Sequence, residues 1–161
     1  MRSVTRTTPL GAPAAVVWER AGTLEGVNAE LRPILRMTAP RDMRGATLAD
    51  LEPGVPAGRS WILLGGFLPV DYDDLCLAEI EPPRRFLERS TMLSMSSWQH
   101  ERVVEPLSEG TCTITDTLTF ELRGPLRRLP GVEALSQRIV TMLFRHRHRR
   151  LAATHGPAAA G

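Results

Sequence analysis

Lysine is absent from this chain, and all twenty of its basic residues are arginine. Alanine, proline and glycine are abundant, which indicates a bias in genome composition, so a single arginine is not by itself evidence of function. The net charge of +2 is too small to indicate a polyanionic partner. The clustered arginines 145, 147, 149 and 150 would point to different sides of a helix, so we expect no nucleic-acid partner.

Cysteine and long apolar runs are also scarce. The only two cysteines, Cys76 and Cys112, fall in strand-like segments without the spacing of metal ligands. They predict buried thiols in a reducing compartment rather than a disulfide framework. No apolar run approaches the roughly 20 residues of a membrane span, and the N-terminus lacks the apolar segment of a signal peptide. We therefore expect a soluble, cytoplasmic protein without membrane insertion.

The length and composition favour one folded unit. A chain of 161 residues, with 42% apolar and 24% charged residues, is long enough to bury a core and ordinary in composition for a globular protein. We expect a single domain over residues 1–155 and a disordered tail over residues 156–161.

Strand signals dominate the chain before residue 124. A first strand over 3–9 precedes two short helices, at 14–20 and 24–31. Further strands are predicted at 34–38, 59–65, 74–80, 85–94, 97–105 and 111–123, and the short turns between the later ones indicate an antiparallel meander. The segment 40–58 is rich in proline and glycine. It is either a lid over a cavity mouth or a passive surface loop.

Residues 129–153 form the only long segment with helical periodicity. At about 100° per residue, the main apolar sector holds Val132, Leu135, Ile139, Met142, Leu143 and His146. A second apolar stripe beside it holds Val140, Phe144 and Leu151. Because so wide an apolar face must lie against a large surface, we expect this helix to cover the sheet.

The last two strands allow a prediction of register. In 111–122 the odd positions through 119 are all threonine, whereas the even positions are apolar except for Asp116. The even positions are therefore the core face. A three-residue turn over 108–110 with glycine last sets the pairing. That pairing places Arg102 opposite Asp116, His100 opposite Leu118, and Trp98 opposite Phe120.

The predicted inward face therefore carries Trp98, His100, Arg102 and Asp116 among apolar neighbours. Buried ions need partners, so Arg102 and Asp116 are either a structural ion pair in a filled core or part of the lining of a pocket, which is the interpretation we favour. His146 is either a hydrogen-bonded core residue or a group that faces His100 or Arg102. His148 points away from His146 on a straight helix, so we expect no metal site.

The order of elements resembles the START-like (SRPBCC) superfamily, which includes polyketide cyclases, aromatases and lipid-transfer proteins. The resemblance covers about residues 3–153. It includes the stretches 16–18, 66–69, 98–102 and 143–151, which resemble a bacterial branch of that superfamily. It implies an α+β helix-grip fold, in which a curved antiparallel sheet of about six to seven strands wraps around the long C-terminal helix, with two short helices after the first strand. It also implies a START-like ligand-binding domain with a cavity for an apolar or amphipathic small molecule, but it transfers no catalytic signature.

Three functions remain open: a carrier, a cyclase or dehydratase, and a regulatory interaction module. In a carrier, Arg102 would anchor a carboxylate, phenolate or carbonyl. In an enzyme, His100 or His146 would be the general base, Asp116 would orient the polar groups, and Arg102 would stabilise an enolate. We expect no cofactor, and a homodimer is left open. The candidate ligand-binding residues are Trp98, His100, Arg102, Asp116, Phe120, Leu135, Ile139, Met142 and His146.

Overall fold

The computed structural model describes residues 1–40 and 45–158. Its elements in chain order are β1 (Arg2–Leu10), α1 (Ala14–Ala21), α2 (Leu24–Leu31), β2 (Leu35–Met37), η2 (Leu48–Asp50), β3 (Pro56–Leu64), β4 (Leu68–Glu81), β5 (Arg85–Met92), β6 (Met95–Ser108), β7 (Thr111–Leu122), α3 (Gly124–Arg127) and α4 (Val132–His155). Within these described residues, no helix is long and apolar enough to cross a membrane.

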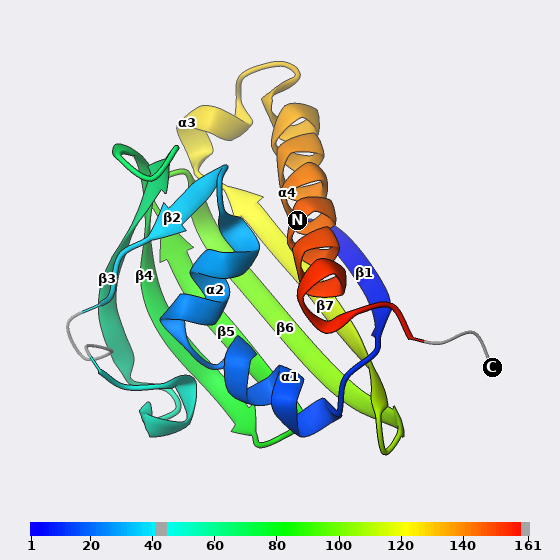
Figure 1. Ribbon diagram of the computed structural model, residues 1–161. Coiled ribbons are helices and arrows are strands. Elements are labelled where there is room, and N and C mark those ends of the chain that lie inside the picture. The colour runs from blue at the N-terminus through cyan, green and yellow to red at the C-terminus, as the bar shows by residue number, and fades with distance from the viewer. Residues whose placement is uncertain (41–44, 159–161) are drawn as a thin grey trace.

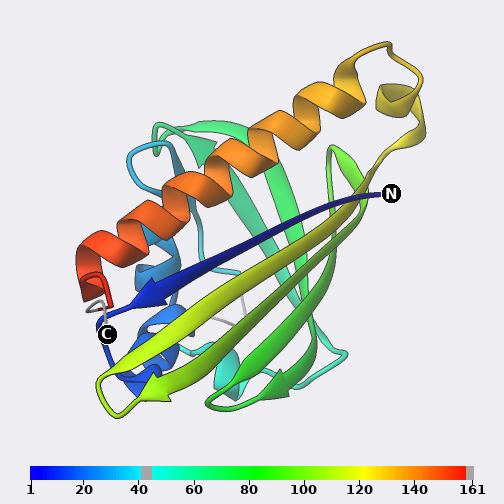
Figure 2. The ribbon, with the colours of Figure 1, turned by 90° about the vertical axis from the view of Figure 1, so that its right-hand side faces the viewer.

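Seven strands form one antiparallel sheet in the order β1-β7-β6-β5-β4-β3-β2. The sheet curls around α4, which packs against β1 and α2, and the short helices α1 and α2 lie inside the same curve (Figures 1 and 2). The predicted architecture is therefore confirmed: a curved sheet wraps around a long C-terminal helix, with two short helices after the first strand.

The predicted register of the β6–β7 hairpin is confirmed, because Arg102 pairs with Asp116 and Trp98 pairs with Phe120. The turn itself is shorter than the predicted three-residue loop. Ser108 pairs directly with Thr111, and the register shifts between residues 106 and 108. The hydroxyl oxygens of Ser108 and Thr111 lie 2.7 Å apart. Because these two residues pair, only residues 109 and 110 remain in the turn, and the residue between 106 and 108 forms a bulge.

The buried face of α4 differs from the prediction. Its buried residues are Val140, Phe144, Arg147, His148 and Leu151, which continue the second apolar stripe. Leu135, Ile139 and Met142 of the predicted main sector are 56%, 50% and 58% exposed. The count of apolar residues gave the wrong buried face because two basic side chains, Arg147 and His148, are buried beside the second stripe. Both contact carboxylates of other elements.

The structure describes parts of the segment 40–58 and of the C-terminal tail. Within the segment 40–58, Thr47 and Asp50 form a capping box, with the Thr47 amide donating to Asp50 Oδ2 at 2.8 Å. Residues 41–44 of this segment lie outside the described residues. The tail predicted to be disordered is paired at its start, because the Gly11 amide donates to the Gly156 carbonyl at 2.9 Å and Leu10 bridges to Pro157. Residues 159–161 lie outside the described residues.

Candidate functional site

A cavity of about 580 Å³ lies between the inner face of the sheet, α2 and α4. Its volume is within the usual range of small-molecule sites. Ile139 and Met142 line it while remaining half exposed, so the cavity opens along this side of α4. Pro40 and Leu48, from the predicted lid segment, also line it. The apolar part of its wall includes Leu31, Met37, Ile62, Leu75, Trp98 and Phe144.

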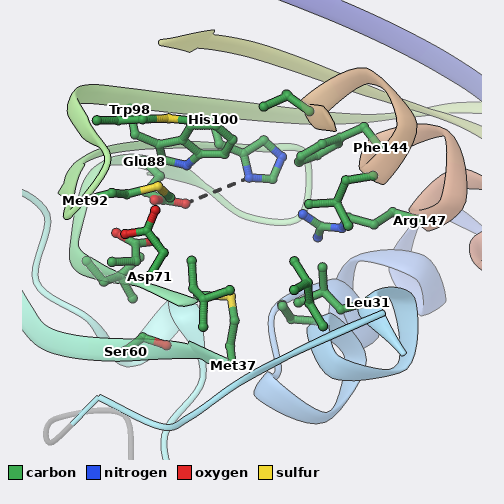
Figure 3. Close-up of a pocket in the computed structure, with 18 of the residues that line it drawn as sticks. Leu31, Met37, Ser60, Asp71, Glu88, Met92, Trp98, His100, Phe144 and Arg147 are labelled. Atoms are coloured by element: carbon green, nitrogen blue, oxygen red, sulfur yellow. Dashed lines mark ion pairs between the residues drawn. The ribbon is translucent and has the colours of Figure 1, made fainter. Parts of the chain in front are cut away.

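Polar side chains enter this apolar cavity mainly from the strands. Figure 3 shows Asp71, Glu88 and His100 on the sheet side, across from Arg147 on α4. Because inward residues alternate along a strand, neighbouring strands bring their polar inward positions together. Apart from Asp71, these groups belong to two sets, which we call the ion cluster and the carboxyl pair.

The ion cluster is centred on Arg102 of β6, which is fully buried. Its Nε and Nη2 donate to the two oxygens of Asp116 on β7 at 2.7 and 2.8 Å. Its Nη1 and Nη2 donate to the two oxygens of Glu30 on α2 at 2.8 and 2.9 Å. Two bidentate pairs therefore use the guanidinium of Arg102 almost completely.

Three further side chains complete the ion cluster. Arg147 Nε donates to Glu30 Oε2 at 2.9 Å. His100 Nε2 lies 2.9 Å from Asp116 Oδ1, and His148 Nε2 lies 3.0 Å from Asp116 Oδ2. Since an ionised carboxylate only accepts, both imidazoles donate from Nε2. With neutral histidines, the two guanidinium charges balance the two carboxylate charges.

The charges of the ion cluster fix the protonation of its acids. Burial alone would raise the pKa of Asp116, but Arg102 and His100 outweigh it and hold that pKa well below its usual range. Burial likewise opposes ionisation of Glu30, and Arg102 with Arg147 lowers its pKa nonetheless. Both carboxylates are therefore charged at neutral pH.

The carboxyl pair consists of Asp73 on β4 and Glu88 on β5, both of which line the cavity. Ser90 donates its hydroxyl to Glu88 Oε1 at 2.8 Å, and His100 Nδ1 lies 3.8 Å from Glu88 Oε2. Asp73 is 2% exposed, and its Oδ1 has no hydrogen-bond partner among the described residues. Burial, together with the nearby Glu88 carboxylate, raises the pKa of Asp73 well above its usual range.

The structure brings together only some of the predicted site residues. Trp98, His100 and Arg102 line the cavity, and Asp116 lies behind Arg102, outside the lining. Phe120 also lies outside the lining, in the apolar core around Phe144. The strand part of the prediction therefore gave the correct face, and part of that face is core rather than cavity wall.

Of the four α4 residues predicted for the site, Ile139 and Met142 line the cavity, whereas Leu135 does not. His146 is outside the lining too, and its Nε2 lies 2.8 Å from the Arg32 carbonyl oxygen near the surface. His148 takes the place that was predicted for His146, because the buried face of α4 is the second stripe.

Sequence reasoning missed the acids that face the cavity and the ion cluster. Asp73 was missed because the predicted strand began one residue later, although alternation through Asp71, Asp73 and Leu75 would have placed it inside. Glu30 follows Val27 by three positions on α2, which is the spacing of one helix face. Arg147 gave no such signal, since its burial depends on Glu30.

Comparison with solved structures identifies the fold as the START-like helix-grip fold. Protein CV1439 of Chromobacterium violaceum is 13% identical, with a TM-score of 0.72 over 98% of this chain and 99% of that one. A START superfamily protein of Mycobacterium smegmatis is 12% identical, with a TM-score of 0.62 over 94% and 98%. The Zhui aromatase/cyclase of Streptomyces sp. R1128 is 16% identical, with a TM-score of 0.63 over 96% of each chain. At these identities the likeness concerns the fold alone.

Within this fold class, the chain belongs to the family described as "Domain of unknown function (DUF8410)", whose model matches residues 8–155. A comparison with curated proteins gives no match.

Proposed function

We propose that residues 1–155 form a single domain that binds an apolar or amphipathic small molecule in the cavity between the sheet and α4. The observation that carries this proposal is a cavity of about 580 Å³ whose walls are largely apolar and whose polar groups are few and convergent. An apolar ligand gains free energy there by removing its surface from water. The polar groups would orient one end of it.

The open side of the cavity offers a direct test, because α4 supplies a matched pair of positions. Ile139 lines the cavity at 50% exposure, and Leu135, one turn earlier, is 56% exposed and lies outside the lining. We expect Ile139→Trp to place its ring in the opening and to raise the Kd of the neutral dye Nile red by about tenfold or more, a cost of about 1.4 kcal/mol. Fluorescence titration measures this.

Leu135→Trp is the control, and it should bind Nile red like the parent protein. The proposal is contradicted if Nile red does not bind, or if the two tryptophan variants weaken it equally. Native mass spectrometry of freshly purified protein gives an independent measurement, since a retained small molecule would be lost selectively from Ile139→Trp.

A second candidate function is a cyclase or dehydratase that uses His100 as a general acid–base. His100 favours it because this side chain lines the cavity between two carboxylates, with Nε2 on Asp116 and Nδ1 facing Glu88. An imidazole that is held by a carboxylate and lines a cavity is typical of acid–base sites. If the candidate is correct, His100→Gln keeps its affinity for Nile red but loses about 10²–10⁴ in turnover of a poly-β-ketone substrate. A parent protein without turnover would exclude it.

A further inference from the structure

The polar wall of the cavity formed by β4 and β5 is acidic. Asp71, Asp73 and Glu88 all line the cavity from these adjacent strands. Asp71 is already engaged, because its Oδ1 accepts from the Leu93 amide at 2.9 Å and its Oδ2 accepts from the Ser94 hydroxyl. It therefore holds the β5–β6 turn, and the carboxyl pair of Asp73 and Glu88 is left to face the cavity.

The carboxyl pair lacks a matching cation. Among the described residues, the only basic group within 4.0 Å of either carboxylate is His100, whose Nδ1 is 3.8 Å from Glu88 Oε2, beyond hydrogen-bond length. The other ring nitrogen of His100 is committed to Asp116. Asp73 Oδ1 is thus a buried polar atom without a hydrogen-bond partner among the described residues, which is costly unless a ligand supplies one.

The arginines of the cavity wall do not offer an acidic ligand a free cation. Arg102 is held by Glu30 and Asp116, and Arg147 is held by Glu30. The two guanidinium charges of the ion cluster are already matched by two carboxylates, and a ligand carboxylate at Arg102 would have to displace one of its two bidentate pairs. We therefore propose an anchor other than Arg102, for which the sequence predicts that role toward a carboxylate, phenolate or carbonyl.

We propose that the ligand is an amphipathic amine whose protonated nitrogen donates to the carboxyl groups of Asp73 and Glu88, while its apolar part fills the cavity. This inference rests on the proposed function. An ammonium group carries three donors, and its hydrogen bonds to carboxylates are charge-assisted. Burial and the nearby Glu88 carboxylate raise the pKa of Asp73, because no cation among the described residues offsets them. An ammonium group would supply that missing positive charge.

The test compares three molecules with the same alkyl chain: decylamine, decanol and decanoic acid. Each is titrated against protein loaded with Nile red, and the displacement gives its Kd. We expect decylamine to bind at least about tenfold more tightly than decanol, and decanoic acid to bind most weakly, because a charge-assisted bond to a buried carboxylate exceeds a neutral one.

Two isosteric variants then test whether the carboxyl pair causes the preference for decylamine over decanol. Asp73→Asn and Glu88→Gln should each reduce the affinity for decylamine by about tenfold and leave that for decanol within about threefold, which also shows that the cavity is intact. The matched control is Asp74→Asn. Asp74 is the next residue on β4 and is paired with Arg59 at 2.8 Å on the outer face, so its replacement should leave the affinities for all three molecules unchanged.

The possible failures are distinct. If Nile red and decanol bind but decanoic acid competes as well as decylamine, the amine inference is wrong and the proposed function stands. The inference is also overturned if Asp73→Asn keeps the preference for decylamine, or if Asp74→Asn abolishes it equally. If no displaceable Nile red binds to the parent protein, both the inference and the proposed function are wrong.

Discussion

The ion cluster and the carboxyl pair are two polar regions that meet at His100, and they differ in charge balance. The ion cluster sets two arginines against two carboxylates and links α2, β6, β7 and α4. The carboxyl pair sets two acids side by side and leaves the Oδ1 of Asp73 without a partner among the described residues. Both regions are buried, so burial alone does not distinguish them.

The difference indicates what each region does. A buried charge network whose members satisfy one another fixes the positions of the elements that carry them. Here the ion cluster holds both α2 and α4 against the inner face of the sheet, which sets the width of the cavity. For the incompletely satisfied acid at the cavity wall, we propose instead that a ligand supplies the missing partner. The two interpretations of Arg102, structural ion pair and cavity lining, therefore both apply.

The largest expected effect comes from breaking the ion cluster at its centre. Arg102→Met leaves Glu30 and Asp116 buried without their shared cation, and we expect the free energy of unfolding to fall by about 3–5 kcal/mol. Urea denaturation followed by circular dichroism measures this loss.

The control for this prediction is Arg59→Met. Arg59 donates to Asp74 with similar geometry, at 2.8 and 2.9 Å, but on the exposed face of the sheet. Exposed pairs contribute about 0–1 kcal/mol, so this variant should be nearly as stable as the parent protein. If the two arginine variants lose equal free energy of unfolding, the ion cluster does not have the structural role assigned to it.

The sheet could be predicted from sequence because its pattern is local. Alternating threonine and apolar residues in β7 allow only one inward face, and a slip by one residue would have buried the threonines. The pairing of Arg102 with Asp116 followed from that face and is confirmed. The bulge beside the β6–β7 turn did not follow, since it depends on the contact between Ser108 and Thr111.

The buried face of α4 could not be predicted in the same way. His148 is buried because its Nδ1 lies 2.8 Å from Thr8 Oγ1 and its Nε2 contacts Asp116, and those partners come from β1 and β7. Arg147 is buried because Glu30 of α2 receives it. A count of apolar residues along one helix contains neither partner. The site therefore emerged only when four separate elements were placed together.

A smaller effect tests the carboxyl pair without any ligand. The pKa of Asp73 is raised in the folded protein by burial and by Glu88, compared with about 3.9 for an aspartate in an unfolded chain. At pH values between the unfolded pKa and the folded pKa of Asp73, the folded state binds one more proton than the unfolded state. The stability that Asp73 contributes is therefore complete at low pH and is lost as the pH rises through the folded pKa. Asp73→Asn has no ionisable group at this position, so its stability does not fall in this way as the pH rises.

We therefore expect Asp73→Asn to match the parent protein at pH values near 4 and to exceed its stability by of the order of 1 kcal/mol at pH values near 8. Asp74→Asn should show the opposite slope. The hydrogen bond from Arg59 lowers the pKa of Asp74, so the stability contributed by Asp74 is present at neutral pH and is lost as the pH falls. Thermal denaturation of both variants across this range measures the two slopes. Parallel slopes would contradict the contrast between a partnered surface acid and an unpartnered acid at the cavity wall.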